Sequence, residues 1–399
     1  MSNTINDKHD TTSYENCSYP REIFDGNLLY ESFLKAKQGS SWKPAVQKFD
    51  FIYLLHLAEL HKQLSTQTYH FHAAHDFILN ERGKTRCVSG ECLNDRIVKH
   101  ALCDEYLTPA THKYLIYDNG ASQVGKGVDF ARRRLETHLH KYYNKYHTND
   151  GYVLLIDFSK YYDNIQHKVF YDQIANCVDN QNVLELLRDV LKHEQVDVSY
   201  MSDEEYANCM QDVFNSLEYA KIPQDLLTGT KYMAKHLNIG NQVAQNAGIS
   251  YPIRLDNYIK IVRSVKYYGR YMDDCYILYP IKEYLVTLLN DIVVVAKELG
   301  ITINLNKTRI CKLSSRWRFL QILYSLTKTG HVIKKINPKN LTRMRRRMKK
   351  LVYGGNLTPT ELENYYKSWF RNYYKLMSKQ QREHMDALYN KCMEDLVNV

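Results

Sequence analysis

Two adjacent carboxylates, Asp273 and Asp274, lie inside the aromatic and aliphatic run KYYGRYMDDCYILY. A third, Asp157, lies near the end of another apolar run, YVLLIDF. Short apolar runs are typical of buried strands, and acids at strand ends and hairpin turns meet when the strands are neighbours in a sheet. An isolated Asp-Asp pair is more often a polar turn. Three clustered carboxylates, however, repel one another unless cations neutralise them, and hard oxygen ligands favour Mg²⁺.

Such a cluster can carry out phosphoryl transfer. Two divalent ions held about 3.5–4 Å apart clamp the attacking and the leaving oxygen of an in-line displacement. Asp157, Asp273 and Asp274 are therefore candidate metal ligands and catalytic residues, with Mg²⁺ as the candidate cofactor and Mn²⁺ as a substitute. From these residues alone, the reading of Asp273-Asp274 as a polar turn stays open.

The amino-acid composition limits the classes of protein to which this chain can belong. With 399 residues, 44% of them hydrophobic and 25% charged, the chain is long enough for two or three subdomains. The net charge of +10 favours a polyanionic partner, and 34 tyrosines suit either base stacking or a protein core. We expect neither a membrane span nor a secretory signal, because no long uncharged apolar run is present. Nine irregularly spaced cysteines favour a reducing compartment, so the expected location is cytoplasmic.

The elements that position the acids can be outlined from periodicity. Helical patterns precede and follow the strand-like stretch 68–89: one runs through Leu29 and Phe33, a second through Phe51 and Leu54, and others span about 95–107 and 126–145. For the 95–107 helix we predict Asn94 as the N-cap and Thr108-Pro109 as the stop.

The C-terminal part has a different character. From His331 to Leu351 there are nine Lys or Arg residues and no acid. Leu341, Met344 and Met348 recur at helical spacing, so one face is apolar and the other basic. Capping signals at Thr358 and at 378–381 predict two further helices.

Several motifs resemble, in order, those of the reverse transcriptases of bacterial and phage retroelements. YMDD (271–274) is similar to the signature hairpin of that family, and LLIDFSKYYDNI (154–165) is similar to its first catalytic-aspartate motif. The others are LNIGNQVAQ (237–245), which resembles the template and nucleotide motif, GITINLNKTRI (300–310), which resembles the later palm motif, and RFLQILYSL (318–326), which resembles the primer grip. The resemblance covers about residues 25–390.

The resemblance implies an α+β fold, the right-hand polymerase, with an antiparallel palm sheet and a helical thumb. The domains expected from it are a flexible N-terminal arm (1–24), fingers (25–150, with part of 205–245), a palm (151–335, including a helical, locally acidic region at 164–230) and a helical thumb (336–399). The partners that it implies are a template RNA, a DNA or RNA primer and deoxynucleoside triphosphates. An accessory protein or a noncoding RNA is a further candidate partner, and no membrane is expected.

The resemblance also implies roles for single residues. Asp157 and Asp273 would bind both metals, and Asp274 would complete the cluster. Tyr162 matches the steric gate that excludes a ribose 2′-OH. Lys307 matches the general acid for the leaving pyrophosphate.

Other matched residues would bind substrates. Lys84 and Arg86 match the fingers residues that neutralise the triphosphate, while Gly240 and Gln245 would line the nucleotide and template side. On the basic helix, the residues expected to follow the nucleic-acid backbone are Lys339, Arg343, Arg346, Arg347 and Lys350.

The motifs indicate less clearly which kind of reverse transcriptase the chain resembles. IGNQVAQ resembles the [IVL]GxxxSQ pattern of diversity-generating retroelement enzymes, but Ala244 stands where that pattern has Ser. Gln321 replaces the glycine of the common FLG motif in the primer grip. An antiphage defence enzyme on the same core is the alternative, and a catalytically silent RNA-binding scaffold is a third reading.

Overall fold

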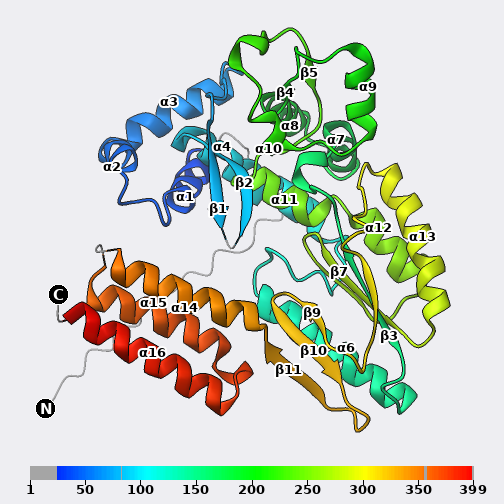
Figure 1. Ribbon diagram of the computed structural model, residues 1–399. Coiled ribbons are helices and arrows are strands. Elements are labelled where there is room, and N and C mark those ends of the chain that lie inside the picture. The colour runs from blue at the N-terminus through cyan, green and yellow to red at the C-terminus, as the bar shows by residue number, and fades with distance from the viewer. Residues whose placement is uncertain (1–24, 82, 355–356, 398–399) are drawn as a thin grey trace, which may run out of the picture. The chain divides into compact units, whose positions relative to one another are not determined.

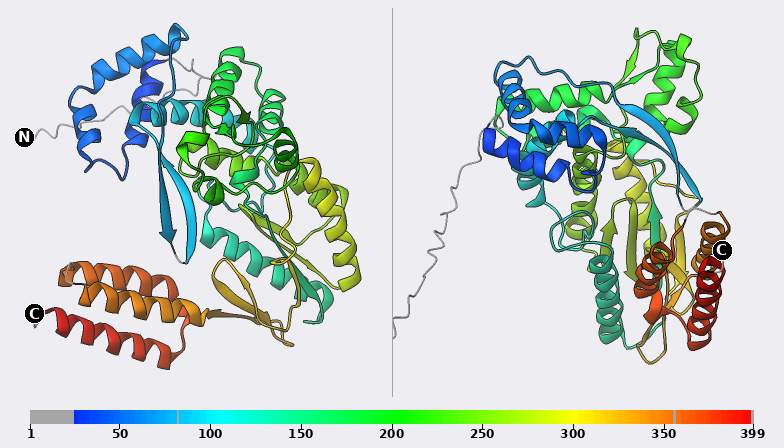
Figure 2. Two further views of the ribbon diagram at one scale, coloured as in Figure 1. Left: turned by 45° about the horizontal axis from the view of Figure 1, so that its top comes forward. Right: turned by 90° about the vertical axis from the view of Figure 1, so that its left-hand side faces the viewer.

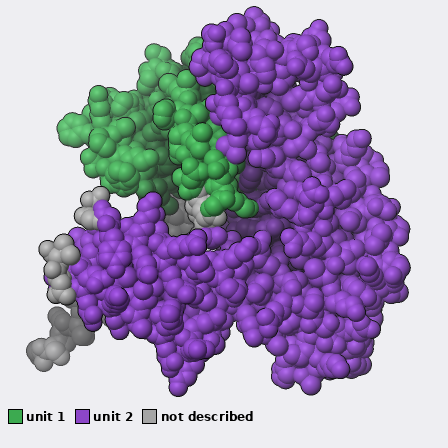
Figure 3. Space-filling model, viewed as in Figure 1, with its two compact units in different colours: residues 1–113, 170–195, 238–246 green, residues 114–169, 196–237, 247–399 purple. Residues whose placement is uncertain are grey.

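The computed structural model describes residues 25–81, 83–354 and 357–397 (Figure 1). These residues form two compact units, shown in different colours in Figure 3. Unit 1 contains the described residues up to 113 together with 170–195 and 238–246, and unit 2 contains 114–169, 196–237 and the rest of the chain from 247. The predicted arm of residues 1–24 lies outside the described residues. Within the described part of the chain, no helix is both long and apolar enough to cross a membrane.

Unit 1 combines a β-hairpin with helices. The hairpin pairs β1 (His75–Glu81) with β2 (Lys84–Gly90) in antiparallel register. The helices are α1 (Gly26–Ala36), α2 (Pro44–Phe51), α3 (Tyr53–Ser65), α4 (Leu93–Leu102), α5 (Thr108–His112), most of α7 (His167–Ala175) and α8 (Gln181–His193). The strand-like stretch and the first helix were therefore predicted correctly.

Three expectations for unit 1 need correction. Cys92, not Asn94, is the N-cap of α4, and the helical path passes through Thr108-Pro109 by way of a π-helix, η1 (Cys103–Leu107), into α5. Proline is tolerated there because it lies in the first turn of α5, where its missing N–H has no intrahelical partner to lose. The pattern through Phe51 and Leu54 is divided between α2 and α3, and both side chains are exposed.

Unit 2 is built around a four-stranded antiparallel sheet in the order β6-β7-β3-β8. The strands are β3 (Tyr152–Asp157), β6 (Tyr268–Tyr271), β7 (Asp274–Tyr279) and β8 (Arg309–Lys312). This agrees with the predicted antiparallel palm sheet, and the two central strands are those that carry the acidic motifs. The chain as a whole mixes helix and sheet, as expected of an α+β fold.

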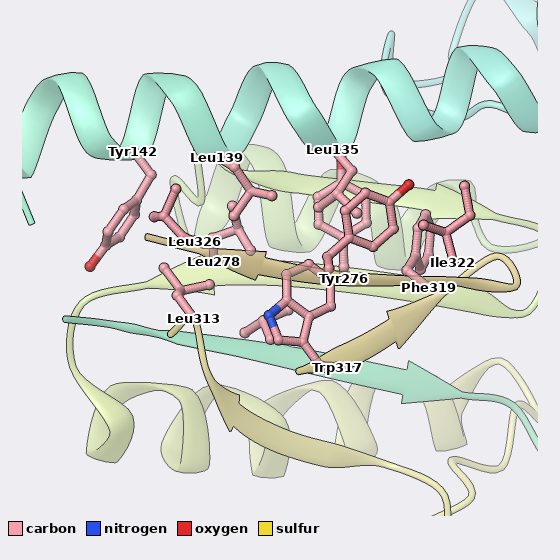
Figure 4. Close-up of a cluster of buried hydrophobic side chains, with 12 residues drawn as sticks. Leu135, Leu139, Tyr142, Tyr276, Leu278, Leu313, Trp317, Phe319, Ile322 and Leu326 are labelled. Carbon is pink, nitrogen blue, oxygen red and sulfur yellow. The ribbon is translucent and has the colours of Figure 1, made fainter. Parts of the chain in front are cut away.

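One face of this sheet packs against α6 (Val128–Tyr146) and a second sheet of β9 (Trp317–Phe319), β10 (Ile322–Leu326) and β11 (Val332–Ile336). Figure 4 shows Leu135, Leu139 and Tyr142 projecting from α6 toward Tyr276 and Leu278 of β7. The alternate residues of β3 and β7 are buried on the opposite face, because successive side chains of a strand point to opposite sides.

The α-helices between residues 237 and 300 are α11 (Gln242–Ser250), α12 (Ile253–Asn257) and α13 (Lys282–Glu298); residues 242–246 of α11 belong to unit 1 and the rest to unit 2. The acidic region contains β4 (Val196–Asp197), α9 (Asp203–Gln211), α10 (Ser216–Tyr219) and β5 (Tyr232–Met233). Ser202 and Glu205 form the predicted capping box of α9.

The C-terminal region contains the three predicted helices, α14 (Pro338–Tyr353), α15 (Pro359–Tyr373) and α16 (Lys379–Val397), which lie side by side in Figures 1 and 2. Leu341, Met344 and Met348 of α14 are buried in a core shared with the other two helices. The capping box at Thr358 is present, and Ser378 and Gln381 exchange the corresponding hydrogen bonds before α16.

Candidate active site

The three acids lie at one end of the palm sheet. Asp157, the last residue of β3, is paired directly with Asp274, the first residue of β7. Directly paired residues of antiparallel strands have Cα atoms about 4.5–5.5 Å apart and side chains on the same face. Met272 and Asp273 form the two-residue turn between β6 and β7, and Asp274 is the first residue of the strand that follows. The pairing therefore brings Asp157 to the Asp273-Asp274 hairpin.

Lys307 contacts this acidic end. Its Nζ lies 3.2 Å from Oδ2 of Asp157, and the Lys307 side chain is 59% exposed. The backbone N–H of Asn304 donates to the carbonyl of Asp157 over 2.8 Å, which ties the segment before Lys307 to the end of β3. The predicted general acid is thus a neighbour of a predicted metal ligand.

Tyr162 lies in a short 3₁₀ helix, η2 (Tyr162–Asn164), and its ring occupies space that Gly248 leaves open. A Cβ on Gly248 would lie 2.4 Å from Oη of Tyr162 and 3.2 Å from the sulfur of Met272. Burial, together with the carboxylate of Asp273, raises the pKa of Tyr162 to about 12. The structure therefore places the predicted steric gate beside the hairpin that carries Asp273.

A buried arginine supports this hairpin. Arg270 of β6 is 1% exposed and donates from Nε and Nη2 to the carboxylate of Asp256. Its Nη1 also donates to the backbone carbonyls of Met272, at 3.0 Å, and of Gly248, at 3.3 Å. Burial opposes the charged form of Arg270, but the Asp256 carboxylate outweighs it and raises the pKa of Arg270 above its usual value. Arg270 therefore links the turn of the hairpin, at Met272, to the backbone of Gly248, which lies next to Tyr162.

The outer side of β6 is supported by residues 118–120. The backbone N–H of Arg270 donates to the carbonyl of Asp118, and the N–H of Gly120 donates to the carbonyl of Arg270. The Asp118 carboxylate accepts from Arg134 at 2.6 Å and from Lys260 at 2.9 Å. Burial would raise the pKa of Asp118, but hydrogen bonds with His138 and Lys260 hold it well below its usual range.

We did not identify Arg270, Asp256, Gly248 or Asp118 as functional from the sequence. The sequence could have indicated that Arg270 is part of a buried ion pair, because a charged residue inside a run typical of a buried strand requires a buried counter-charge. Which acid supplies that charge could not be deduced, because several acids lie at comparable distances along the chain.

The donor set at the sheet end suits a hard divalent cation. The ligand atoms are carboxylate oxygens, and the Asp157, Asp273 and Asp274 side chains are all partly exposed, so an ion and its bound waters could reach them. A thiol lies next to this set, but Cys275 is buried, and burial raises its pKa above the ordinary value. The thiol is therefore a poor ligand here, and the three carboxylates remain the predicted ligands.

Four of the predicted substrate-binding residues belong to unit 1. Lys84 and Arg86 lie on β2, where Lys84 is exposed and Arg86 half-buried. Gly240 has a φ of +126°, a conformation that favours glycine, and a Cβ at this position would lie 3.5 Å from the carbonyl oxygen of Ser89 on β2. Gln245 is exposed on α11. The structure thus brings Gly240 to the strand of Lys84 and Arg86. In unit 2 it pairs Asp157 with Asp274 and places Lys307 beside Asp157 and Tyr162 beside the turn with Asp273.

The predicted backbone-binding residues share one face of α14. All five are exposed: Lys339, Arg343, Arg346, Arg347 and Lys350. The opposite face is buried in the C-terminal core. A helix face with these five exposed cations is suited to binding phosphates without reading bases.

Comparison with known proteins agrees with this geometry. A search of curated proteins finds no match. A family model described as "Reverse transcriptase (RNA-dependent DNA polymerase)" matches residues 78–324, more than half of the chain, and the match includes the strands with Asp157, Asp273 and Asp274. Enzymes of this family generally use divalent metal ions, usually Mg²⁺. The chain therefore belongs to the reverse transcriptase family and is an RNA-directed DNA polymerase, a nucleotidyltransferase.

Proposed function

We propose that this chain extends a primer on an RNA template by two-metal nucleotidyl transfer centred on Asp157, Asp273 and Asp274. The observation that carries the proposal is the direct pairing of Asp157 with Asp274, next to the turn of the β6–β7 hairpin. Divalent ions held by these acids would activate the primer 3′-OH and neutralise the charge on the triphosphate. The protein's part is to fix the positions of the carboxylates, which the buried Arg270 supports through Met272.

Other residues would select the nucleotide, assist the departure of pyrophosphate and bind the substrates. Tyr162 would exclude the 2′-OH of ribonucleotides, because its ring lies against Gly248 and its hydroxyl lies 3.7 Å from the sulfur of Met272, beside the turn with Asp273. Lys307 would donate a proton to the leaving pyrophosphate, a role that its position beside Asp157 allows. Lys84, Arg86, Gly240 and Gln245 would form the nucleotide and template side, and the exposed basic face of α14 would bind the template–primer backbone.

For the biological subtype we propose an enzyme similar to those of diversity-generating retroelements in a prokaryote or phage. The support is the IGNQVAQ motif, in which Ala244 is buried and donates a hydrogen bond from its backbone N–H to the Asn241 side chain. A defence enzyme on the same core is the alternative. Sequencing of the products decides between them: errors concentrated at template adenines support the first, and uniform fidelity at all four bases supports the second.

The central test is primer extension. Purified protein should add deoxynucleotides to a DNA primer on an RNA template with Mg²⁺ or Mn²⁺, and chelation should stop the reaction. Asp273→Asn should reduce the rate by at least about 10³-fold while leaving RNA binding intact, because it removes a metal ligand and leaves the phosphate-binding residues in place. Glu383→Gln, the same change of acid to amide at an exposed position of α16, is the matched control and should be active.

Two outcomes would count against the proposal. Full activity of Asp273→Asn would show that the metal assignment is wrong. Binding of RNA by a wild-type protein that adds no nucleotide under any of these conditions would support the silent scaffold.

A further inference from the structure

Three side chains that can bind a metal ion converge at the base of the β1–β2 hairpin in unit 1. His72 lies just before β1, while Cys92 and Asp95 lie at the start of α4, just after β2. The pairing of His75 with Gly90 holds the two ends of the hairpin together. Nδ1 of His72 lies 3.4 Å from Sγ of Cys92 and 3.0 Å from Oδ1 of Asp95, and the three atoms all lie within 4.8 Å of one another. The fold thus gathers a nitrogen, a thiol and a carboxylate from both ends of the hairpin.

The carboxylate of this cluster is buried. Asp95 is 1% exposed, and among the residues that the structure describes no Lys or Arg forms an ion pair with it. Burying a carboxylate costs free energy unless a counter-charge or a metal ion binds it. A bound divalent cation would supply that counter-charge.

Hydrogen bonds hold the ligands in place. The hydroxyl of Tyr69 donates to Oδ1 of Asp95, and the backbone N–H of His72 donates to Oδ2 over 3.0 Å. Nε2 of His193 lies 2.9 Å from the carbonyl oxygen of His72, which ties the segment before β1 to α8 as well as to α4. Such outer hydrogen bonds orient metal ligands and strengthen binding.

The spacing of the ligand atoms suits a tetrahedral zinc ion. Bonds of about 2.0–2.3 Å at tetrahedral angles separate a nitrogen ligand from an oxygen ligand by about 3.4 Å and from a sulfur ligand by about 3.6 Å. The two contacts of Nδ1 of His72 are a few tenths of an ångström shorter, so small side-chain rotations would admit the ion. The His72 side chain is 52% exposed, so the ion can enter from solvent, and water can be the fourth ligand.

The thiol favours zinc over Mg²⁺. Burial raises the pKa of Cys92 to about 11, and the backbone N–H groups of Asp95 and Asn94 oppose that rise. An ion that binds this sulfur must therefore displace a proton into solvent. Zinc binds thiolates tightly enough to do so at neutral pH, whereas Mg²⁺ prefers carboxylate and water oxygens.

We propose that His72, Cys92 and Asp95 bind one zinc ion, which fastens the two ends of the β1–β2 hairpin to each other. All three ligands belong to unit 1, so this site is separate from the acids of the palm sheet in unit 2. An ion bound to both ends closes the loop that contains β1 and β2, and this closure lowers the entropy of the open states. The hairpin that carries Lys84 and Arg86 would therefore be more rigid with zinc than without it.

The test is metal binding by the full chain, stripped of metal and kept with a thiol-free reductant and excess Mg²⁺. Cobalt(II) replaces zinc and reports a bond to thiolate by a charge-transfer band in the near ultraviolet. Wild type should develop this band with one equivalent of cobalt, and zinc should abolish it by competition. Cys92→Ser should lose the band, and both Cys92→Ser and His72→Ala should bind zinc at least about 100-fold more weakly.

Matched variants of the same region test the specificity of the site. Tyr69→Phe keeps the ring but removes the hydrogen bond to Asp95, so it should weaken zinc binding about tenfold. Cys87→Ser and His75→Ala, on the strands of the hairpin, are the controls and should bind zinc as wild type does.

Alkylation provides a measurement that needs no substitution. Cys92 is exposed, so iodoacetamide should modify it in the metal-free wild type, and zinc should slow this reaction at least about tenfold. The rate at Cys87, followed in the same digest by peptide mass spectrometry, should not change. This result decides the question if a ligand variant is unfolded without metal, as judged by circular dichroism.

Three results would each overturn the proposal: no thiolate band in wild type, equal zinc affinity of wild type and both ligand variants, or unaltered alkylation of Cys92 in the presence of zinc. The measurements use no primer and no nucleotide. Their outcome therefore does not depend on whether the chain extends primers, and a failure of the proposed function would leave it unchanged.

Discussion

Arg270 donates a hydrogen bond from Nη1 to the backbone carbonyl of Met272 over 3.0 Å, so a fully buried cation fixes the turn that carries Asp273. Met272 itself has a φ of +53°, a conformation that a non-glycine residue seldom adopts. The hairpin is therefore held from within the core and not by its own turn residues. Substitutions of Arg270 and Asp256 can therefore test its effect on the position of this turn separately from its effect on the free energy of unfolding.

The first prediction concerns the buried ion pair. Arg270→Met should lower the free energy of unfolding by about 3–5 kcal/mol, because it leaves the Asp256 carboxylate buried without a counter-charge. Arg270→Met combined with Asp256→Leu should recover much of that loss in urea unfolding. Primer extension by the double variant should stay low, because the Met272 carbonyl still lacks its donor. Full activity of the double variant would mean that Arg270 serves stability alone.

The second prediction concerns sugar selection by Tyr162. Replacement by Ala should lower the preference for deoxynucleotides over ribonucleotides by about 10- to 100-fold, because the ring that would collide with the 2′-OH is gone. The ratio of kcat/KM for the two nucleotides measures the change. Tyr162→Phe, which keeps the ring, is the control and should retain the preference. Unchanged selectivity in the alanine variant would refute the gate role.

The third prediction concerns the space beside Tyr162. Gly248→Ala would place a methyl group 2.4 Å from Oη of Tyr162, so the ring must shift and nucleotide incorporation should fall about tenfold or more. In the Tyr162→Phe background the nearest ring atom would be Cζ, at 3.1 Å, and the same change should cost less. A double-mutant cycle on kcat/KM measures the difference. Additive effects would show that Gly248 does not act through Tyr162.

The fourth prediction concerns salt dependence. Replacing Arg343, Arg346 and Lys350 by Gln should reduce the slope of log affinity against log salt by about 0.7–0.9 for each phosphate that the helix no longer neutralises. The effect should be the same for templates of different sequence, since binding to phosphates carries no base information. Lys379→Gln and Lys391→Gln, on the exposed surface of α16, form the control and should leave the slope unchanged. An unaltered slope in the triple variant would remove α14 from the nucleic-acid interface.

The fifth prediction concerns acid stability. The folded-state pKa of Asp118 is lower than the unfolded-state value, so its contribution is present above about pH 4 and is lost as pH falls through the folded-state pKa. Asp118→Asn should therefore reduce stability at pH 7 by about 2–3 kcal/mol. It should also flatten the fall in stability below pH 4, as followed by urea unfolding at successive pH values. A fall in the variant as steep as that of wild type would contradict the assignment.

The sequence by itself determined the elements and the chemical type of the site. Apolar runs of strand length marked the strands that end at Asp157 and begin at Asp274, and helical spacing marked the buried face of α14. The ordered motifs predicted the acids, Tyr162 and Lys307 as site residues. These features are local, since each depends on residues within a few positions of one another, and local periodicity is therefore enough to reveal them.

The tertiary structure alone decided how the site is supported. The pairing of Asp157 with Asp274 depends on the register of strands that are more than a hundred residues apart, and no single stretch of sequence encodes that register. The partner of Arg270, the room that Gly248 gives Tyr162, and the left-handed turn at Leu320 and Gln321 likewise arise from packing between distant segments. Packing determines which buried charges meet and which backbone angles a turn must adopt, because only the assembled core fixes the ends of each segment.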